Sequence, residues 1–149
     1  KTLFQINLGA AIEINRLVIS GKTKNKLLKL VHVGSIASNE AVGSVGYNIA
    51  KSGLAAYVRS LGRELYKDKV IVTGILPGGF TAPNNAMERF RKKNNKDYKK
   101  FIKTRLPRGF MGRADEILPM LLFLCSRYSS MMGGCLVPID AGEGKTYQI

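Results

Sequence analysis

The segments LVHVGS, residues 30–35, and GSVGYNIAKSGL, residues 43–54, decide the fold of this chain. The first segment is an apolar run of the kind found in buried strands, and it ends in a glycine and a small hydroxyl residue. The second begins as a glycine-containing loop and continues as an amphipathic helix. A buried strand that leads into an amphipathic helix is the repeating unit of parallel α/β sheets.

Tyr47 and Lys51 lie four residues apart at the start of this helix, so their side chains project from the same face. A phenol ordinarily ionises at about pH 10, and a nearby ammonium favours the phenolate. The pair therefore fits a proton donor and acceptor for neutral pH. Ser35, at the end of the strand, can hydrogen-bond the same substrate oxygen. Such pairs also occur on solvated helix faces, and such a serine also closes turns.

The order Ser35, Tyr47, Lys51 resembles the active-site pattern of the short-chain dehydrogenase/reductase family. Further segments, spread over nearly the whole chain, are similar to segments of that family in the same order: INLG (6–9), ILPGG (75–79), RADEI (113–117), LCS (124–126) and GCLVPIDAG (134–142). Ala141 replaces one glycine of the family pattern. The resemblance implies an enzyme that interconverts a carbonyl and an alcohol with NAD or NADP.

The resemblance implies a catalytic set of four residues: Asn7, Ser35, Tyr47 and Lys51. Tyr47 would exchange a proton with the substrate oxygen, and Ser35 would donate a hydrogen bond to it. Lys51 would support Tyr47 and hold the nicotinamide ribose. Asn7 would hold a water that links Lys51 to solvent, or else would bond a local carbonyl of its own helix. Ser38 is a weaker candidate for the role of Ser35.

The resemblance also implies residues that bind the cofactor: Tyr47, Lys51, Pro77, Gly78, Gly79 and Thr81. Glycines in the turn at 77–79 allow the backbone to approach the nicotinamide closely, although an ordinary strand-to-helix turn has the same composition. The family usually has a threonine where this chain has Ala82, so Thr81 is the candidate for that contact. Ligands of doubly wound sheets bind at the carboxyl ends of strands, where Ser35 and this turn both lie.

The family's phosphate-binding turn, T-G-x-x-x-G-x-G, does not occur in this sequence. That turn lets backbone amides approach the pyrophosphate at a helix N-terminus. We therefore expect residues 1–149 to be the carboxyl-terminal part of a single domain that lacks its dinucleotide-binding half, and the isolated segment to be inactive. The alternative is a short protein that has lost cofactor binding and acts as a scaffold.

Alternating elements predict the second half of a doubly wound, Rossmann-like sheet, with three parallel strands and flanking helices. Strands are expected at 27–33, 70–76 and 136–139, and helices at 4–19, 47–66, 83–103 and 115–127. In the resembled family the helices at 4–19 and 47–66 form the subunit interface, which implies a homodimer or homotetramer here.

Cys125 and Cys135 have no metal-ligand spacing, so no metal site is predicted. We expect both to be buried, in a protein of the reducing cytoplasm. No apolar run reaches the roughly 18 residues of a membrane span, and we expect no membrane association.

The formal net charge is +14, and much of it is concentrated between residues 89 and 108. In the resembled family this region covers the active site, where basic side chains would attract a phosphorylated or carboxylated substrate, such as a sugar nucleotide. The simpler interpretation of this basic region is a helix whose charged face is exposed to solvent. Loops at 74–80 and 139–144 are similar to reductases of surface-glycan or flagellin modification. Aromatic residues interleaved with the basic ones also resemble a nucleic-acid surface, but no recognised nucleic-acid motif accompanies them.

Overall fold

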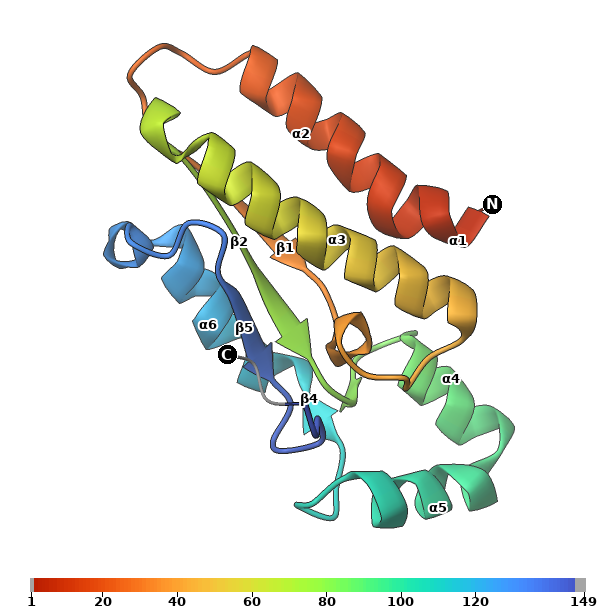
Figure 1. The fold of residues 1–149 in the computed structure, drawn as a ribbon. Coiled ribbons are helices and arrows are strands. Elements are labelled where there is room, and N and C mark those ends of the chain that lie inside the picture. The colour runs from red at the N-terminus through yellow and green to blue at the C-terminus, as the bar shows by residue number, and fades with distance from the viewer. Residues whose placement is uncertain (1, 147–149) are drawn as a thin grey trace.

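The computed structural model describes residues 2–146. It has a three-stranded parallel sheet with helices on both faces (Figure 1). The strands are β1 (Leu28–Val33), β2 (Val70–Pro77) and β5 (Leu136–Ile139), in the order β1-β2-β5. Val33 lies opposite Ile75 at the end of the first pairing. The predicted parallel α/β fold is confirmed, with each strand within one residue of its expected position.

The central strand β2 is buried along its whole length. Val70, Val72 and Leu76 belong to the core on one face of the sheet, and Ile75 belongs to the core on the other. A strand covered on both faces is a continuous apolar run rather than an alternating one. This is why the segment was recognisable in the sequence.

Helix α3 (Val45–Glu64) packs on β2, and α2 (Ala10–Ser20) runs beside α3 (Figure 1). Helix α6 (Ala114–Cys125) lies against β1 and β2 on the other face. The predicted helix at 4–19 is interrupted, because a π-helical turn, Gln5–Gly9, separates α2 from the short α1 (Thr2–Phe4). Such turns insert one extra residue into a helix and often mark functional sites.

The predicted basic helix at 83–103 is two helices, α4 (Ala86–Lys93) and α5 (Asn95–Arg105), here together called the lid. The break occurs at Asn94, whose side chain accepts a 3.1 Å hydrogen bond from the amide of Asp97 and so caps α5. A two-stranded parallel sheet of β3 (Phe80–Thr81) and β4 (Gly112–Arg113) lies at the base of the lid.

The lid packs on a small core formed by Tyr98 together with Leu106 and Met111, which follow α5. The Phe90 ring packs edge-on against Tyr98 and Phe101, with centroids 5.8 and 6.3 Å apart. These aromatic rings therefore pack on one another rather than forming an exposed stacking surface.

The expectation that both cysteines are buried was wrong, because Cys125 and Cys135 are exposed free thiols. Cys125 ends α6 next to the fully buried Leu124, and adjacent helical residues point about 100° apart. Among residues 2–146 no helix is both long enough and apolar enough to cross a bilayer.

Candidate active site

A cavity of about 540 Å³ opens at the carboxyl ends of β1 and β2. Its wall includes six of the residues predicted from the sequence: Ser35, Tyr47, Lys51, Pro77, Gly78 and Gly79. They come from the end of β1, the first turns of α3 and the end of β2. This is the edge of a parallel sheet at which ligands bind.

Ser35 follows β1 and caps the short 3-10 helix Ile36–Ser38. Its Oγ accepts a 3.1 Å hydrogen bond from the amide of Ala37. A hydroxyl held in this way keeps its own proton for donation, so Ser35 can hydrogen-bond an oxygen in the cavity. Ser38 has a different role, since its buried Oγ donates a 2.9 Å hydrogen bond to the carbonyl of Lys51.

Tyr47 and Lys51 lie on one face of α3, which is capped by Ser44 at its N-terminus. The Lys51 Nζ lies 5.7 Å from the centroid of the Tyr47 ring and donates a 3.0 Å hydrogen bond to the Val33 carbonyl. Burial lowers the pKa of the Lys51 ammonium, because the charged form loses solvation. An ammonium has three protons to donate, so two remain after the bond to Val33.

Asn7 lies outside this cavity, in the π-helical turn. Its Nδ2 donates a 3.0 Å hydrogen bond to the Leu3 carbonyl. Asn7 instead borders a second cavity of about 470 Å³, between α2 and β1, and Lys51 lines both cavities. The local hydrogen bond agrees with the alternative role given above, and the second cavity brings Asn7 to the same space as Lys51.

The turn at 77–79 needs glycine for lack of space, since a Cβ on Gly78 would lie 2.8 Å from the Asp140 Cβ. Thr81 does not line the cavity. Its Oγ1 donates a 3.2 Å hydrogen bond to the carbonyl of Gly112, because the pairing of β3 with β4 turns the hydroxyl toward β4. The structure therefore does not bring Thr81 to the other predicted cofactor residues.

Sequence reasoning missed several residues of the cavity wall. Asn85, Met87 and Phe101 come from the lid and the residue before it, and Glu143 comes from the loop after β5. The apolar residues of the lid could have been predicted to face the cavity, because they alternate with basic residues at helical spacing. Glu143 had no comparable signal in the sequence. Among residues 2–146 no group of three or more His, Cys, Asp or Glu residues is arranged to hold a metal ion.

Comparison with known proteins gives a consistent result. A family model described as enoyl-(acyl carrier protein) reductase matches residues 1–143. The 3-oxoacyl-[acyl-carrier-protein] reductase of Aquifex aeolicus is 25% identical over 141 residues, which cover 94% of this chain and 54% of that protein. The 2-dehydro-3-deoxy-D-gluconate 5-dehydrogenase of Formosa agariphila is 27% identical over 143 residues, covering 95% and 53%. The chain thus spans about half the length of the curated relatives it matches.

A solved structure shares the fold. The structure of a 4-hydroxyisoleucine dehydrogenase mutant complexed with NADH and succinate superposes with a TM-score of 0.81 at 22% identity, over 94% of this chain and 57% of that one.

Proposed function

This chain belongs to the short-chain dehydrogenase/reductase family, and on that premise we propose that it carries the catalytic residues of an NAD(P)-dependent oxidoreductase. The reaction is the interconversion of a carbonyl and an alcohol. The observation that carries the proposal is that Ser35, Tyr47 and Lys51 line one cavity with the turn at 77–79. We propose further that residues 1–149 are the carboxyl-terminal part of a single domain, which agrees with the share of its relatives that the chain spans.

The residues of the cavity fit the nicotinamide end of NAD or NADP. Lys51 has two protons free to bind ribose hydroxyls. Gly78 and Gly79 offer backbone without side chains, and Gly78 has no room for a Cβ. When bound, the nicotinamide supplies or accepts the hydride.

The proton chemistry belongs to this chain. In the reduction direction the Tyr47 hydroxyl gives its proton to the substrate oxygen, and Ser35 donates a hydrogen bond that stabilises the developing charge. The Lys51 ammonium stabilises the phenolate that remains, and its lowered pKa eases proton return to Tyr47. Asn7, on the far side of Lys51, would hold a water in the second cavity and so connect Lys51 to solvent.

Two features bear on the substrate. The cavity wall is largely apolar, with Val42, Met87 and Phe101 among its residues, whereas the outer face of the lid is strongly basic. We propose a carbonyl compound that carries an anionic group, such as a sugar-derived acid. The Formosa agariphila relative, named for 2-dehydro-3-deoxy-D-gluconate, supports this class. Neither relative reported above is a reductase of surface-glycan or flagellin modification, so that narrower assignment has no support here.

We also propose a homodimer or homotetramer. Four large apolar side chains of α2 are between 40% and 59% exposed: Ile12, Ile14, Leu17 and Val18. Apolar side chains gathered on one helix mark a protein contact, and these lie on the helix that forms the subunit interface in the family.

The test is a steady-state assay of the full-length gene product with NADH and with NADPH. The carbonyl panel should contain oxo sugar acids, 3-oxoacyl thioesters and neutral ketones. The proposal expects turnover that requires both a cofactor and a carbonyl. No turnover with any pair, and no change in NAD(P)H fluorescence on mixing, would support the scaffold alternative instead.

A further inference from the structure

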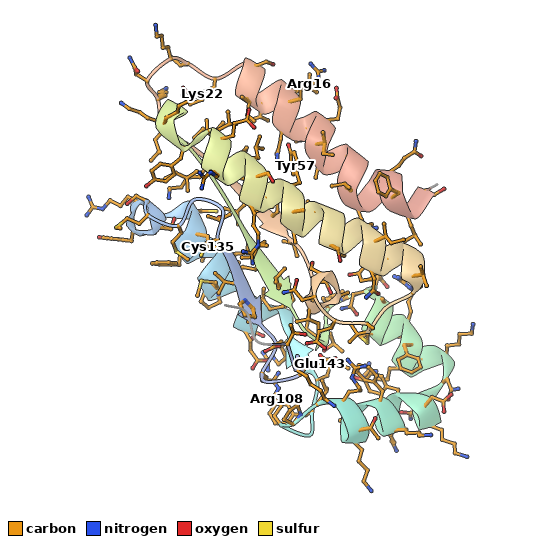
Figure 2. All side chains as sticks on the ribbon, viewed as in Figure 1. Arg16, Lys22, Tyr57, Arg108, Cys135 and Glu143 are labelled. Carbon is orange, nitrogen blue, oxygen red and sulfur yellow. The ribbon has the colours of Figure 1, made fainter. Side chains whose placement is uncertain are left out.

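The carboxylate of Glu143 lies where three segments meet: the lid, the turn at 77–79 and the loop after β5 (Figure 2). Its side chain is 3% exposed. Oε2 accepts a 2.6 Å hydrogen bond from the amide of Gly79, and Oε1 lies 3.5 Å from Nη2 of Arg105. Arg105 is the last residue of α5, so the two oxygens contact two different segments, the turn at 77–79 and the lid.

The loop after β5 is shaped to turn Glu143 inward. The two carboxylate oxygens of Asp140 accept hydrogen bonds from the amides of Gly142, at 3.1 Å, and Gly144, at 2.9 Å. Ala141 and Gly142 have left-handed backbones, with φ of 53° and 78°. Burying a carboxylate is costly unless it is both paired and hydrogen-bonded, and Glu143 is both.

The turn at 77–79 is packed directly on this carboxylate. A Cβ on Gly78 would lie 2.8 Å from the Glu143 Oε2, and a Cβ on Gly79 would lie 3.2 Å from it. The hydrogen bond from Gly79 therefore fixes the orientation of a peptide unit in the segment that we assign to the nicotinamide.

The second oxygen acts on the lid. The Arg105 guanidinium lies 5.9 Å from the centroid of the Phe101 ring, and Phe101 lines the cavity. Contacts thus run from Glu143 through Arg105 to Phe101, an apolar side chain of the cavity wall. The contact with Arg105, here called the lid branch, needs the negative charge of Glu143. The hydrogen bond from the Gly79 amide, here called the turn branch, needs only an acceptor oxygen.

We propose that Glu143 is a positioning residue that couples the cofactor turn to the lid. The inference rests on the proposed function for the assignment of the turn to nicotinamide binding. The two branches have different chemical requirements, so substitutions can separate them. Glu143→Ala removes both branches. Glu143→Gln keeps an oxygen for the Gly79 amide but removes the charge that attracts Arg105. Arg105→Met removes the lid branch from its other end.

The first experiment measures hydrogen–deuterium exchange in the full-length gene product, in peptides covering 76–81 and 99–106. We expect Glu143→Ala to accelerate exchange in both peptides, and Glu143→Gln and Arg105→Met to accelerate it in the lid peptide alone. Unchanged exchange at 76–81 in Glu143→Ala would overturn the proposal. Accelerated exchange at 76–81 in Arg105→Met would also overturn it. This second variant tests the proposal even if Glu143→Ala does not fold.

The second experiment follows binding and kinetics. We expect Glu143→Ala to weaken NAD(P)H binding about tenfold by fluorescence titration, which is the effect of one lost hydrogen bond. Glu143→Gln should keep the cofactor affinity and raise the KM for the carbonyl substrate. Equal cofactor affinity in Glu143→Ala and wild type would contradict the coupling. Exchange needs no turnover, so an inactive full-length protein would refute the proposed function while the exchange pattern still tests Glu143.

Discussion

The Nζ of Lys51 lies 5.7 Å from the centre of the Tyr47 ring and is bonded at 3.0 Å to the carbonyl of Val33. The bond ties α3 to the end of β1, so two elements rather than one helical turn hold the ammonium beside the phenol. Ser35 follows Val33 by two residues and faces the same cavity. Orientation of reacting groups by rigid elements is a large part of enzymatic rate acceleration.

Ser35 and Ser38 form a matched pair of hydroxyls on the same short segment. We expect Ser35→Ala to lower kcat about 10²- to 10³-fold, because a hydrogen bond to the developing negative charge is lost. Ser38→Ala loses only the bond to the Lys51 carbonyl, and should lower stability with a much smaller effect on kcat. A larger loss of kcat in Ser38→Ala than in Ser35→Ala would move the role to Ser38.

The outer face of the lid is exposed and basic, and its few acidic residues are engaged locally. Glu88 pairs with Lys92 at 3.2 Å, and the Asp97 carboxylate accepts a 2.6 Å hydrogen bond from Nδ2 of Asn94. A variant with glutamine at Lys96, Lys99, Lys100 and Lys103 should raise the KM for an anionic substrate and reduce its dependence on salt. The KM for a neutral ketone should stay unchanged.

The control for this variant replaces Lys22, Lys24 and Lys26, which follow α2 far from the lid, with glutamine. If both variants change the KM equally, general net charge rather than the lid attracts the substrate. Loss of heparin or DNA retention in the lid variant alone would instead favour the nucleic-acid interpretation.

Glu116 predicts a specific dependence of stability on pH. Two hydrogen bonds from the Arg108 guanidinium, at 2.7 and 2.9 Å, and one from the amide of Arg113 lower the pKa of this carboxyl from 4.5 to about 2. A carboxyl with a lowered folded pKa stabilises the protein above its unfolded pKa, and this contribution is lost as pH falls through the folded pKa. The free energy of unfolding should therefore fall between pH 4.5 and about 2.

Chemical denaturation over a pH series measures this effect. The decrease should be shallower in Glu116→Gln than in wild type, and unchanged in Glu64→Gln, which alters an exposed acid at the end of α3. Parallel curves for all three proteins would show that the contacts of Glu116 contribute nothing to acid stability.

Ala141 predicts a stabilising substitution. Its φ of 53° lies in the left-handed region, where a Cβ costs about 1 kcal/mol. Ala141→Gly should raise the free energy of unfolding by about 0.5 kcal/mol, because the relief of strain exceeds the extra freedom of glycine in the unfolded chain. Gly142→Ala, at φ 78°, should lower it. Denaturant melts of the two variants provide the comparison. A destabilised Ala141→Gly would show that the loop holds Ala141 for a reason other than backbone geometry.

The strands and main helices were readable because their signals are local. The apolar run of β2 and the stripe of α3 at Leu54 and Val58 follow from burial on regular elements. Tyr47, Lys51 and Ser35 were recognisable because their spacing has a chemical meaning on a helix and at a strand end. The break at Asn94 depends on a side-chain hydrogen bond, and the π-helical turn around Asn7 on a backbone bond from Ala10 to Gln5, and periodicity reports neither.

The contribution of Glu143 was unreadable for a different reason. Its hydrogen bond to Gly79 and its ion pair with Arg105 join positions that lie 64 and 38 residues away in the sequence. Contacts of that kind are set by the packing of three segments and not by any local pattern. Thr81 shows the converse, since its position suggested a cofactor contact but strand pairing directs its hydroxyl to Gly112.

The most direct test of the account is the kcat of Tyr47→Phe in the full-length gene product, measured beside its NAD(P)H affinity and its circular dichroism. Loss of one hydroxyl should lower kcat about 10²- to 10⁴-fold while the fold and the cofactor affinity stay close to wild type. An unchanged kcat would contradict the assignment of Tyr47 as the proton donor, and with it the proposed reaction at this cavity.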